Sequence, residues 1–436
     1  MIVGMVYKIS PGQILIFDIH TTIKQKDIYK PHENGMLLKR VNIVMTKITL
    51  LKIGLVVQVM LRFSSTLNSQ STNYAISRKD LNVPQAKLSQ VASKIEFIPL
   101  EFNRDCTIDM FYGYQVAKAG DNWLVWSIVG NGFIFNPDGK YLGKVGKKGK
   151  GPGEYTQFRR ITWDEGSKKY LMLLTQNRVN VYNPDGSFDR QVKYNIDGEI
   201  WKIAILKDKW ILLESVPQGG DFVKLQYQYS DNKGVTRAPV TIDLKNIIGN
   251  RPYFTDWNSF YVYDEMLRFG GYPPYIIYQL DRLNKWESIY SFEIPVKQLP
   301  DNLNPMPPNN AEFENFVATY GKLDWVQEFN NFFLVRFTSP KRNHFLVRKG
   351  TRELLNCSYD ENSKLGVGLI DDLAGGPCFL PMLETRQNEW VTLISSSDLI
   401  EKSQPHGRYA NELRNAQKKV DQNSNPVIIK VTLITL

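Results

Sequence analysis

A four-residue turn recurs along this chain at a nearly constant distance, and it constrains the fold more than any other feature. Asn-Pro-Asp-Gly stands between two strand-like runs in residues 132–145 and again in residues 179–192. Pro presets the first turn position and Asp-Gly supplies the residue that tolerates a positive φ, so both stretches predict β-hairpins. A third hairpin is expected in residues 225–240, with Asp-Asn-Lys-Gly as its turn.

The glycines of these turns, Gly139, Gly186 and Gly234, are 47 and then 48 residues apart. A period in the forties, with several strands in each unit, is typical of propeller blades. Residues 94–436 have room for six such units with insertions between them. The sequence therefore predicts an all-β fold, a six-bladed β-propeller with short helical insertions.

The later units predict how the ring closes. Further units are expected in residues 275–294 and 333–360, and a last one runs from residue 365 to the C-terminus. Within the last unit, residues 397–422 look helical in two pieces, and the chain ends on an apolar strand. A propeller can close by lending a terminal strand to the blade at the other end, and residues 94–101 (KIEFIPLE) are the candidate.

Three motifs carry a family resemblance: FIPLE near the start of this region, FNPDGKYLGKVGKKGKGPGEY after the first hairpin, and NSNPVIIKVTL at the end. They resemble an uncharacterised six-bladed β-propeller family of Bacteroidetes that is related to the TolB-like and NHL-repeat propellers. The family motif falls here on Gly151, Pro152, Gly153, Glu154 and Tyr155. The resemblance covers about residues 90–436 and implies an exported protein, with no established catalytic residues to transfer.

Residues 45–69 have the layout of a secretory signal peptide. Lys47 supplies a short positive region, an apolar run follows in residues 53–61, and small polar residues continue to Ser69. The apolar run is too short to span a membrane. Residues 1–44 then form an extension that makes little sense ahead of a signal, and a start at Met45 is the alternative.

This layout predicts an exported protein of the periplasm or cell envelope, with a linker over residues 70–93 and the propeller over residues 94–436. No cysteine follows the apolar run, so no residue is present for a lipid anchor. Membrane contact is expected only through the N-terminal segment, if it stays uncleaved, and a monomer is expected. A buried helix or a peripheral amphipathic segment is the alternative interpretation of the apolar run.

The formal charge of +10 does not by itself indicate a nucleic-acid partner. Residues 1–69 hold nine Lys or Arg and three Asp or Glu, which leaves a net charge of only +4 for the rest of the chain. A mildly basic domain is ordinary, so no nucleic-acid partner is predicted.

The three cysteines, Cys106, Cys357 and Cys378, show no CxxC motif and no metal-ligand spacing. Their odd number excludes a fully paired set. A single bridge between Cys357 and Cys378, or three buried free thiols, both stay open.

The glycine-rich stretch in residues 143–155, GKVGKKGKGPGEY, has the composition of a phosphate loop but not its spacing. Pro152 follows Gly151 where a Walker loop needs Lys, and no helix starts there. The stretch is therefore predicted to connect two blades, and anion or polysaccharide binding is the alternative. Glu154, Arg159 and Arg160 are the candidates for contact with an acidic ligand at the channel mouth.

Catalytic and metal chemistry find little support in the sequence. His344 and His406 are the only histidines beyond residue 69, and neither has a partner at ligand spacing. No cofactor is predicted, although calcium held by carboxylates and carbonyls stays open. No G-x-S-x-G elbow occurs. The acids that could form a pair for glycoside cleavage are Asp256, Asp264, Glu265 and Asp324.

Aromatic residues gather in the stretches around residues 251–265 and 269–275. Tyr253, Trp257 and Tyr272 are candidates to stack on a sugar ring or to anchor a protein partner, although packing between blades is the alternative. The leading hypothesis is an exported, non-catalytic propeller that binds or scaffolds a glycan, a peptide or an envelope protein. The alternative is a carbohydrate-active hydrolase or lyase with its site at the channel mouth.

Overall fold

The computed structural model describes residues 5–10, 13–17, 71–108, 113–127, 130–194, 199–206, 209–215, 224–231, 240–243, 260–271, 275–280, 285–295, 322–339, 341–359 and 366–435. The chain divides into two compact units, Met1–Asn68 and Ser69–Leu436. In the first unit, β1 (Met5–Ser10) and β2 (Gln13–Phe17) form an antiparallel hairpin.

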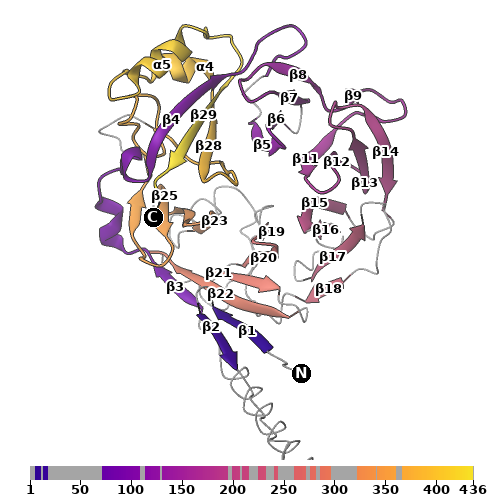
Figure 1. Cartoon of the computed structure of the whole chain (residues 1–436), viewed down its shortest axis with the longest axis horizontal. Coiled ribbons are helices and arrows are strands. Elements are labelled where there is room, and N and C mark those ends of the chain that lie inside the picture. The colour runs from indigo at the N-terminus through magenta and orange to yellow at the C-terminus, as the bar shows by residue number, and fades with distance from the viewer. Residues whose placement is uncertain are drawn as a thin grey trace, which may run out of the picture. The chain divides into compact units, whose positions relative to one another are not determined.

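The second unit consists mainly of β-sheets whose strands follow one another in sequence (Figure 1). Among the described residues, five of these sheets have four strands and one has five. The first three sheets are β5 (Gln115–Ala119), β6 (Asn122–Trp126), β7 (Gly132–Phe135) and β8 (Tyr141–Lys144); β11 (Phe158–Asp164), β12 (Lys169–Leu174), β13 (Arg178–Tyr182) and β14 (Phe188–Lys193); and β15 (Glu199–Leu206), β16 (Lys209–Ser215), β17 (Lys224–Asp231) and β18 (Val240–Asp243).

The remaining sheets include two that recruit strands from the start of the second unit. They are β19 (Phe260–Tyr263), β20 (Met266–Gly271), β21 (Tyr275–Leu280) and β22 (Trp286–Glu293) with β3 (Thr72–Ala75); β23 (Lys322–Glu328), β24 (Phe332–Thr338), β25 (Arg342–Arg348) and β26 (Leu354–Asn356); and the closing sheet of β27 (Leu383–Glu384), β28 (Glu389–Ile394), β29 (Val427–Leu433) and β4 (Ala92–Pro99).

This arrangement confirms the prediction of an all-β propeller with few helices. The first strands β5, β11, β15 and β19 are inner strands, each in contact with the next (Figure 1). The predicted hairpins are present as the antiparallel pairs β7–β8, β13–β14, β17–β18, β21–β22 and β24–β25. Five sheets are four-stranded blades, whereas β3 makes the remaining sheet five-stranded by pairing in parallel with β22.

The Asn-Pro-Asp-Gly turns do more than reverse the chain, because each one contacts the sheet that precedes it. The backbone N–H of Glu101, after β4, donates to the carbonyl of Gly139 at 2.8 Å, and the N–H of Gly146, after β8, donates to the carbonyl of Gly186 at 2.9 Å. Both turn glycines have a positive φ, +84° and +83°. A Cβ on Gly186 would lie 1.9 Å from the carbonyl oxygen of Lys144, so only glycine fits this joint.

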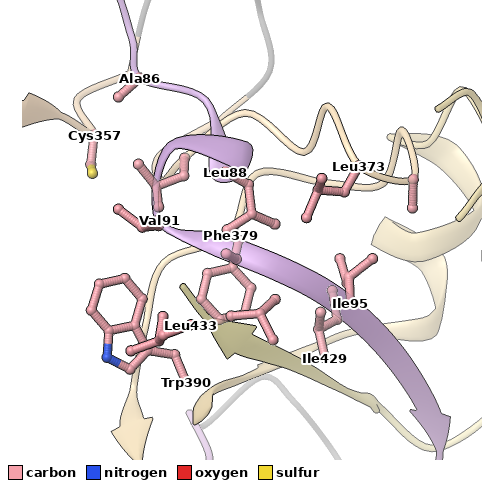
Figure 2. Close-up of a cluster of buried hydrophobic side chains, with 14 of the residues drawn as sticks. Ala86, Leu88, Val91, Ile95, Cys357, Leu373, Phe379, Trp390, Ile429 and Leu433 are labelled. Carbon is pink, nitrogen blue, oxygen red and sulfur yellow. The ribbon is translucent and has the colours of Figure 1, made fainter. Parts of the chain in front are cut away.

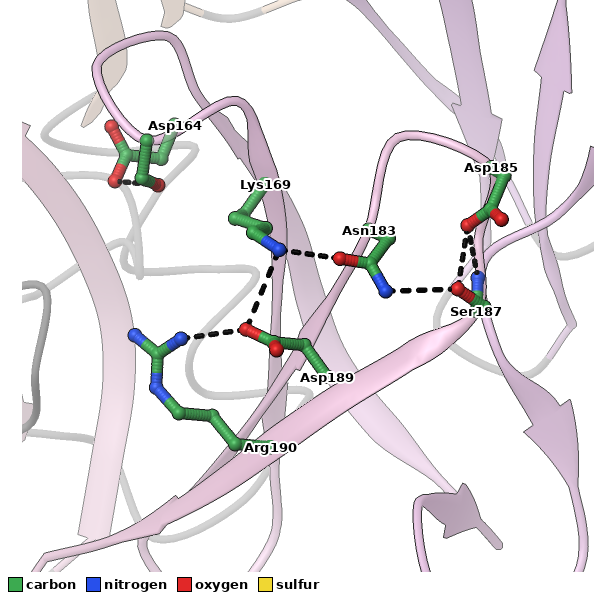
Figure 3. Close-up of polar contacts among 8 residues, drawn as sticks. Asp164, Lys169, Asn183, Asp185, Ser187, Asp189 and Arg190 are labelled. Carbon is green, nitrogen blue, oxygen red and sulfur yellow. Dashed lines mark hydrogen bonds and ion pairs between the residues drawn. The ribbon is translucent and has the colours of Figure 1, made fainter.

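Side chains around the second turn hold it in this position (Figure 3). The carboxylate of Asp185 accepts the backbone N–H of Ser187 at 2.9 Å and its hydroxyl at 2.6 Å. Lys169 donates to the Asn183 amide oxygen and lies 3.5 Å from Asp189. The turn that presents Gly186 is therefore fixed by its own polar groups.

The closing sheet joins the two ends of the second unit. β29 pairs with β4 in antiparallel register from Val427 opposite Pro99 to Leu433 opposite Ala92, so the prediction that residues 94–101 supply the closing strand is confirmed. Figure 2 shows the side chains of this sheet around buried Phe379, with Trp390 fully buried beside it.

Charges on the closing sheet add to this pairing. Lys430 of β29 lies 3.3 Å from Glu96 of β4 and 3.0 Å from Glu389 of β28. Burial works to raise the pKa of Glu96, but the ammonium groups of Lys94 and Lys430 outweigh it and hold that pKa below its usual range. The ionised carboxylate therefore favours the closed pairing.

Residues 70–93, predicted as a linker, instead carry packed structure. They hold β3 and two 3-10 helices, η1 (Arg78–Asn82) and η2 (Leu88–Gln90). Tyr74 of β3 is buried against Phe292 and Phe333, with ring centroids 5.5 and 5.3 Å away. Burial of this ring draws the segment onto the sheets.

The last unit contains the two expected helical pieces, α4 (Ser396–Glu401) and α5 (Ala410–Gln417). Helix α5 turns Ala410, Leu413 and Ala416 inward, and it packs against β4. All three cysteines are free, so the interpretation as free thiols holds and the Cys357–Cys378 bridge is absent. Cys106 and Cys357 are buried, whereas Cys378 is half-buried.

The joint between sheets can be tested at Gly186. Gly186→Ala is expected to lower the free energy of unfolding by more than the ~1–2 kcal/mol that a positive φ costs alone, because its Cβ collides with the Lys144 carbonyl. Gly120→Ala is the matched control, since Gly120 also has a positive φ, of +60°, but nothing lies within 4 Å of the place its Cβ would take. Urea unfolding of both variants measures the difference, and equal losses would contradict the joint.

Candidate functional site

The glycine-rich stretch connects two neighbouring sheets, as predicted. Two short parallel strands, β9 (Lys147–Lys148) and β10 (Glu154–Tyr155), form between β8 and β11. The carboxylate of Glu154 folds back over the loop, where it accepts the N–H of Gly151 at 2.9 Å and lies 3.6 Å from the Lys147 ammonium. The N–H of Gly151, followed by the Lys147 charge, holds the pKa of Glu154 below its usual range.

The loop is also fastened to the sheet that follows it. The hydroxyl of Tyr182 on β13 donates to the carbonyl of Gly153 at 3.0 Å. Gly153 has φ +74°, and a Cβ there would lie 2.3 Å from the Phe188 ring. Tyr155 is buried and meets Phe158 edge-on, with ring centroids 5.3 Å apart. Within the described structure, the family-motif residues thus hold the connection in place, and Glu154 is engaged by its own loop.

Three inner strands share a β-bulge near their beginning. The register shifts between Phe158 and Arg160 in β11, between Ile200 and Lys202 in β15, and between Leu323 and Trp325 in β23. A bulge places two residues opposite one and re-aims side chains, which is why bulges are frequent beside binding sites. The repeated bulge therefore marks the inner edge as irregular in three sheets.

In β11 the bulge exposes two consecutive arginines. Phe158 and Ile161 are both buried although they are three residues apart, and Arg159 and Arg160 between them are only half-buried. Arg160 lies opposite Leu173, on the face of the sheet that packs against β15. Burial lowers the pKa of its guanidinium below the usual range.

The other predicted ligand contacts cannot be placed beside these arginines. Tyr253, Trp257 and Tyr272 lie outside the described residues, and so does Asp256. Asp264 and Glu265 form the turn between β19 and β20, with φ of +49° and +56°, and both are exposed. Asp324 lies 3.4 Å from Arg336 and accepts the Thr338 hydroxyl at 3.2 Å. Of the four acids considered for glycoside cleavage, the three that the structure describes therefore belong to a turn or to an ion pair.

A buried charge cluster, which the sequence did not reveal, lies between the sheets β19–β22 and β23–β26. Glu328 at the end of β23 has a side chain that is 0% exposed. It pairs with Arg268 of β20 and with Lys349 at 2.6 Å, and it accepts the Tyr261 hydroxyl at 2.9 Å. The ring of Tyr263 lies 4.5 Å from the Arg268 guanidinium and 4.3 Å from the Lys349 ammonium.

The cluster continues to the closing sheet. The backbone N–H of Asn330 donates to Glu384 of β27 at 2.5 Å, yet burial raises the pKa of this carboxyl. Burial lowers the pKa of Lys349 despite its pairing with Glu328, and burial raises the pKa of Tyr263 to about 12. The only sequence signal was the pair Gln-Glu at the end of β23. The other two charges come from distant stretches, since Arg268 belongs to β20 and Lys349 follows β25.

Neither a metal centre nor a membrane helix emerges from the described residues. No group of three or more His, Cys, Asp or Glu side chains is close enough there to hold a metal ion. No helix in the described part of the chain is long and apolar enough to cross a membrane.

His344, a residue considered for metal binding, is instead buried in β25, with 4% of its surface exposed. Burial, together with the charges of Arg336 and Arg342, lowers the pKa of His344 to about 4. Its Nδ1 has no hydrogen-bond partner among the described residues. The imidazole is therefore neutral in the folded protein at neutral pH.

The buried cluster can be tested at Glu328. Glu328→Gln is expected to lower the free energy of unfolding by about 3–5 kcal/mol, because Arg268 and Lys349 stay buried without their counter-charge. Adding Lys349→Met to this variant should restore part of the loss. Glu165→Gln, which removes one charge from an exposed pair with Lys168, should change the free energy by less than about 1 kcal/mol. Equal stability of Glu328→Gln and the wild type in urea would contradict the cluster's contribution.

The neutral His344 predicts a pH dependence of stability. Above pH ~6.5 the imidazole is neutral in both states and costs nothing, whereas below that the unfolded chain binds a proton that the folded protein does not accept until about pH 4. The loss should approach about 3 kcal/mol at and below pH 4. Urea unfolding from pH 7 to 4 should give a steeper decline for the wild type than for His344→Gln, and His406→Gln, at an exposed histidine, should follow the wild type.

Comparison with solved structures gives a match in fold that spans most of the chain. The chain is similar to a protein of Bacteroides fragilis NCTC 9343 that is named as presumed to be exported, at 16% identity and a TM-score of 0.62, over 84% of this chain and 100% of that one. The Myceliophteria thermophila Cps50 (Swd1) β-propeller domain matches at 14% identity and a TM-score of 0.33, over 60% and 77% of the two chains. At such identities these likenesses concern the fold alone.

Comparison of sequences gives the family. No curated protein matches the chain. A family model described as a domain of unknown function, DUF4934, matches residues 74–432, which runs from β3 through β29 and so includes every sheet of the second unit. The chain therefore belongs to the DUF4934 family.

Proposed function

We propose that this chain is an exported, non-catalytic β-propeller that binds a glycan, a peptide or an envelope protein at the inner edge of its sheets. Export is supported by the signal layout of residues 45–69 and by the name of the Bacteroides fragilis protein of similar fold. The periplasm or cell envelope is the proposed location, with residues 1–44 as an extension ahead of the signal.

One observation carries the binding proposal: the bulge that recurs at the start of β11, β15 and β23. A bulge adds one unpaired residue and re-aims the side chains beside it, and bulges are frequent next to active sites. In β11 these side chains are Arg159 and Arg160, whose planar guanidinium groups suit carboxylate, sulfate or phosphate.

We further propose that the five-stranded sheet counts as a sixth blade and that the family is related to the TolB-like and NHL-repeat propellers. The proposed partners are a glycan or an envelope protein and not nucleic acid, and the proposed state is a monomer. No cofactor is invoked, and calcium binding stays open as an expectation. Membrane contact would come only through an uncleaved N-terminal segment.

A hydrolase or lyase acting on carbohydrate is the second candidate. The observation in its favour is Glu384, a carboxyl on inner strand β27 whose pKa is raised by burial, which is the state a general acid needs. Glu328 argues the other way, because its side chain is fully buried against Arg268, Lys349 and Tyr261 and so cannot serve as the second carboxyl.

The experiment is binding of the purified protein to an array of bacterial glycans and to separated envelope proteins, followed by mass spectrometry of the bound material. We expect at least one retained class and no cleavage product. Arg159→Gln should weaken this binding, whereas Arg190→Gln, on outer strand β14 of the same sheet, should not. Absence of any binding would overturn the proposal, and cleavage products would favour the enzyme.

A further inference from the structure

Arg160 differs from Arg268, Lys349 and Lys430 because no counter-charge pairs with it among the described residues. Arg268 and Lys349 share Glu328, and Lys430 lies between two glutamates. In the part of the chain that the structure describes, no acidic side chain pairs with Arg160, and burial alone accounts for the lowered pKa of its guanidinium. A desolvated, unpaired charge costs stability, so its retention needs a reason beyond packing.

On its face of the sheet, Arg160 lies beside apolar residues of two neighbouring sheets. Arg160 lies opposite Leu173, whose side chain belongs to a buried apolar cluster with Ile200 and Ile203 of β15. The start of β15 is tied to the turn before β13, because the N–H of Ile200 donates to the Asn177 side-chain oxygen at 2.8 Å. The face of the sheet on which Arg160 lies is therefore apolar, and the half-buried side chain keeps part of its surface open.

We propose that Arg160 is the anchor of an anion-binding site at the inner ends of β11 and β15, which takes a carboxylate, sulfate or phosphate group of a ligand. The guanidinium offers two parallel N–H donors to such a group, and apolar surroundings strengthen the charge-assisted hydrogen bonds. This site would supply the anion-binding part of the proposed binding function, on which its biological role rests. Anion binding itself can be tested separately.

The bulge at Arg159 gives the site its geometry. In a regular strand Arg160 would share a face with Phe158, which is buried in the cluster on the other side of the sheet. The extra residue moves Arg160 to the face of Leu173 and places Arg159 beside it. A sequence change that removed the bulge would therefore bury or redirect the guanidinium.

The test is thermal unfolding of the purified protein with millimolar glucuronate, sulfate or phosphate, each compared with chloride at constant ionic strength. We expect at least one of the three anions to raise the Tm of the wild type in a saturable way. Arg160→Met should have a higher Tm than the wild type in chloride, because it removes an unpaired buried charge, and it should lose the anion effect. Arg160→Lys should bind the anion about 10-fold or more weakly, since it lacks the planar fork.

Each outcome has a defined meaning. Arg190→Met is the matched control and should keep the full anion effect, because Arg190 lies on β14 beside Asp189. Stabilisation by glucuronate alone supports an acidic sugar as the ligand group, and stabilisation by phosphate alone supports a phosphorylated one. No saturable effect of any anion, or a lower Tm of Arg160→Met in chloride, would overturn the site. If an anion raises the Tm but the protein binds nothing on the array of glycans and envelope proteins, the anion site is supported and the proposed partner classes are contradicted.

Discussion

The pairing of β4 with β29 is the interaction on which the remaining structure depends. It joins strands from opposite ends of the second unit over the register from Val427–Pro99 to Leu433–Ala92. Propeller sheets are stable only when each is flanked by neighbours, because every face is apolar and must be covered. The buried side chains in Figure 2 come from both ends of the second unit for this reason, and the contacts of Lys430 with Glu96 and Glu389 reinforce the same pairing.

The hairpin turns connect further pairs of neighbouring sheets. The carbonyl of Gly139 accepts a hydrogen bond from the N–H of Glu101, after β4, and the carbonyl of Gly186 accepts one from the N–H of Gly146, after β8. Each turn thus connects the two strands of one hairpin and also binds the residue that follows the outer strand of the preceding sheet. The glycine-rich connection continues the pattern, since Glu154 closes its own loop while Gly153 rests against Phe188 of the next sheet.

Charged side chains inside this protein occur in two different arrangements, paired and unpaired. The cluster around Glu328 places one fully buried carboxylate between two cations and under a tyrosine hydroxyl, and it joins two sheets. Arg160 is desolvated at an inner strand without such a partner among the described residues. Paired charges of the first kind belong to the architecture, whereas the unpaired guanidinium of Arg160 is the feature on which the proposed anion site rests.

The local structure of this protein follows from its amino-acid order. Asn-Pro-Asp-Gly can only be a turn, the alternating runs beside it can only be strands, and the period of the turn glycines indicates the propeller, because all three depend on backbone preferences of a few adjacent residues. The sequence also predicted the closing strand and the two helices, and it showed that residues 143–155 lack the spacing of a phosphate loop. Contacts between distant residues, in contrast, follow only from the folded chain. Folding brought Glu328 to Arg268 and Lys349, placed β3 on the edge of β22, and put Arg160 on the face toward β15, where no described acidic side chain pairs with it. These results depend on which sheets lie side by side and on a one-residue bulge, and neither is encoded in any short stretch of the chain.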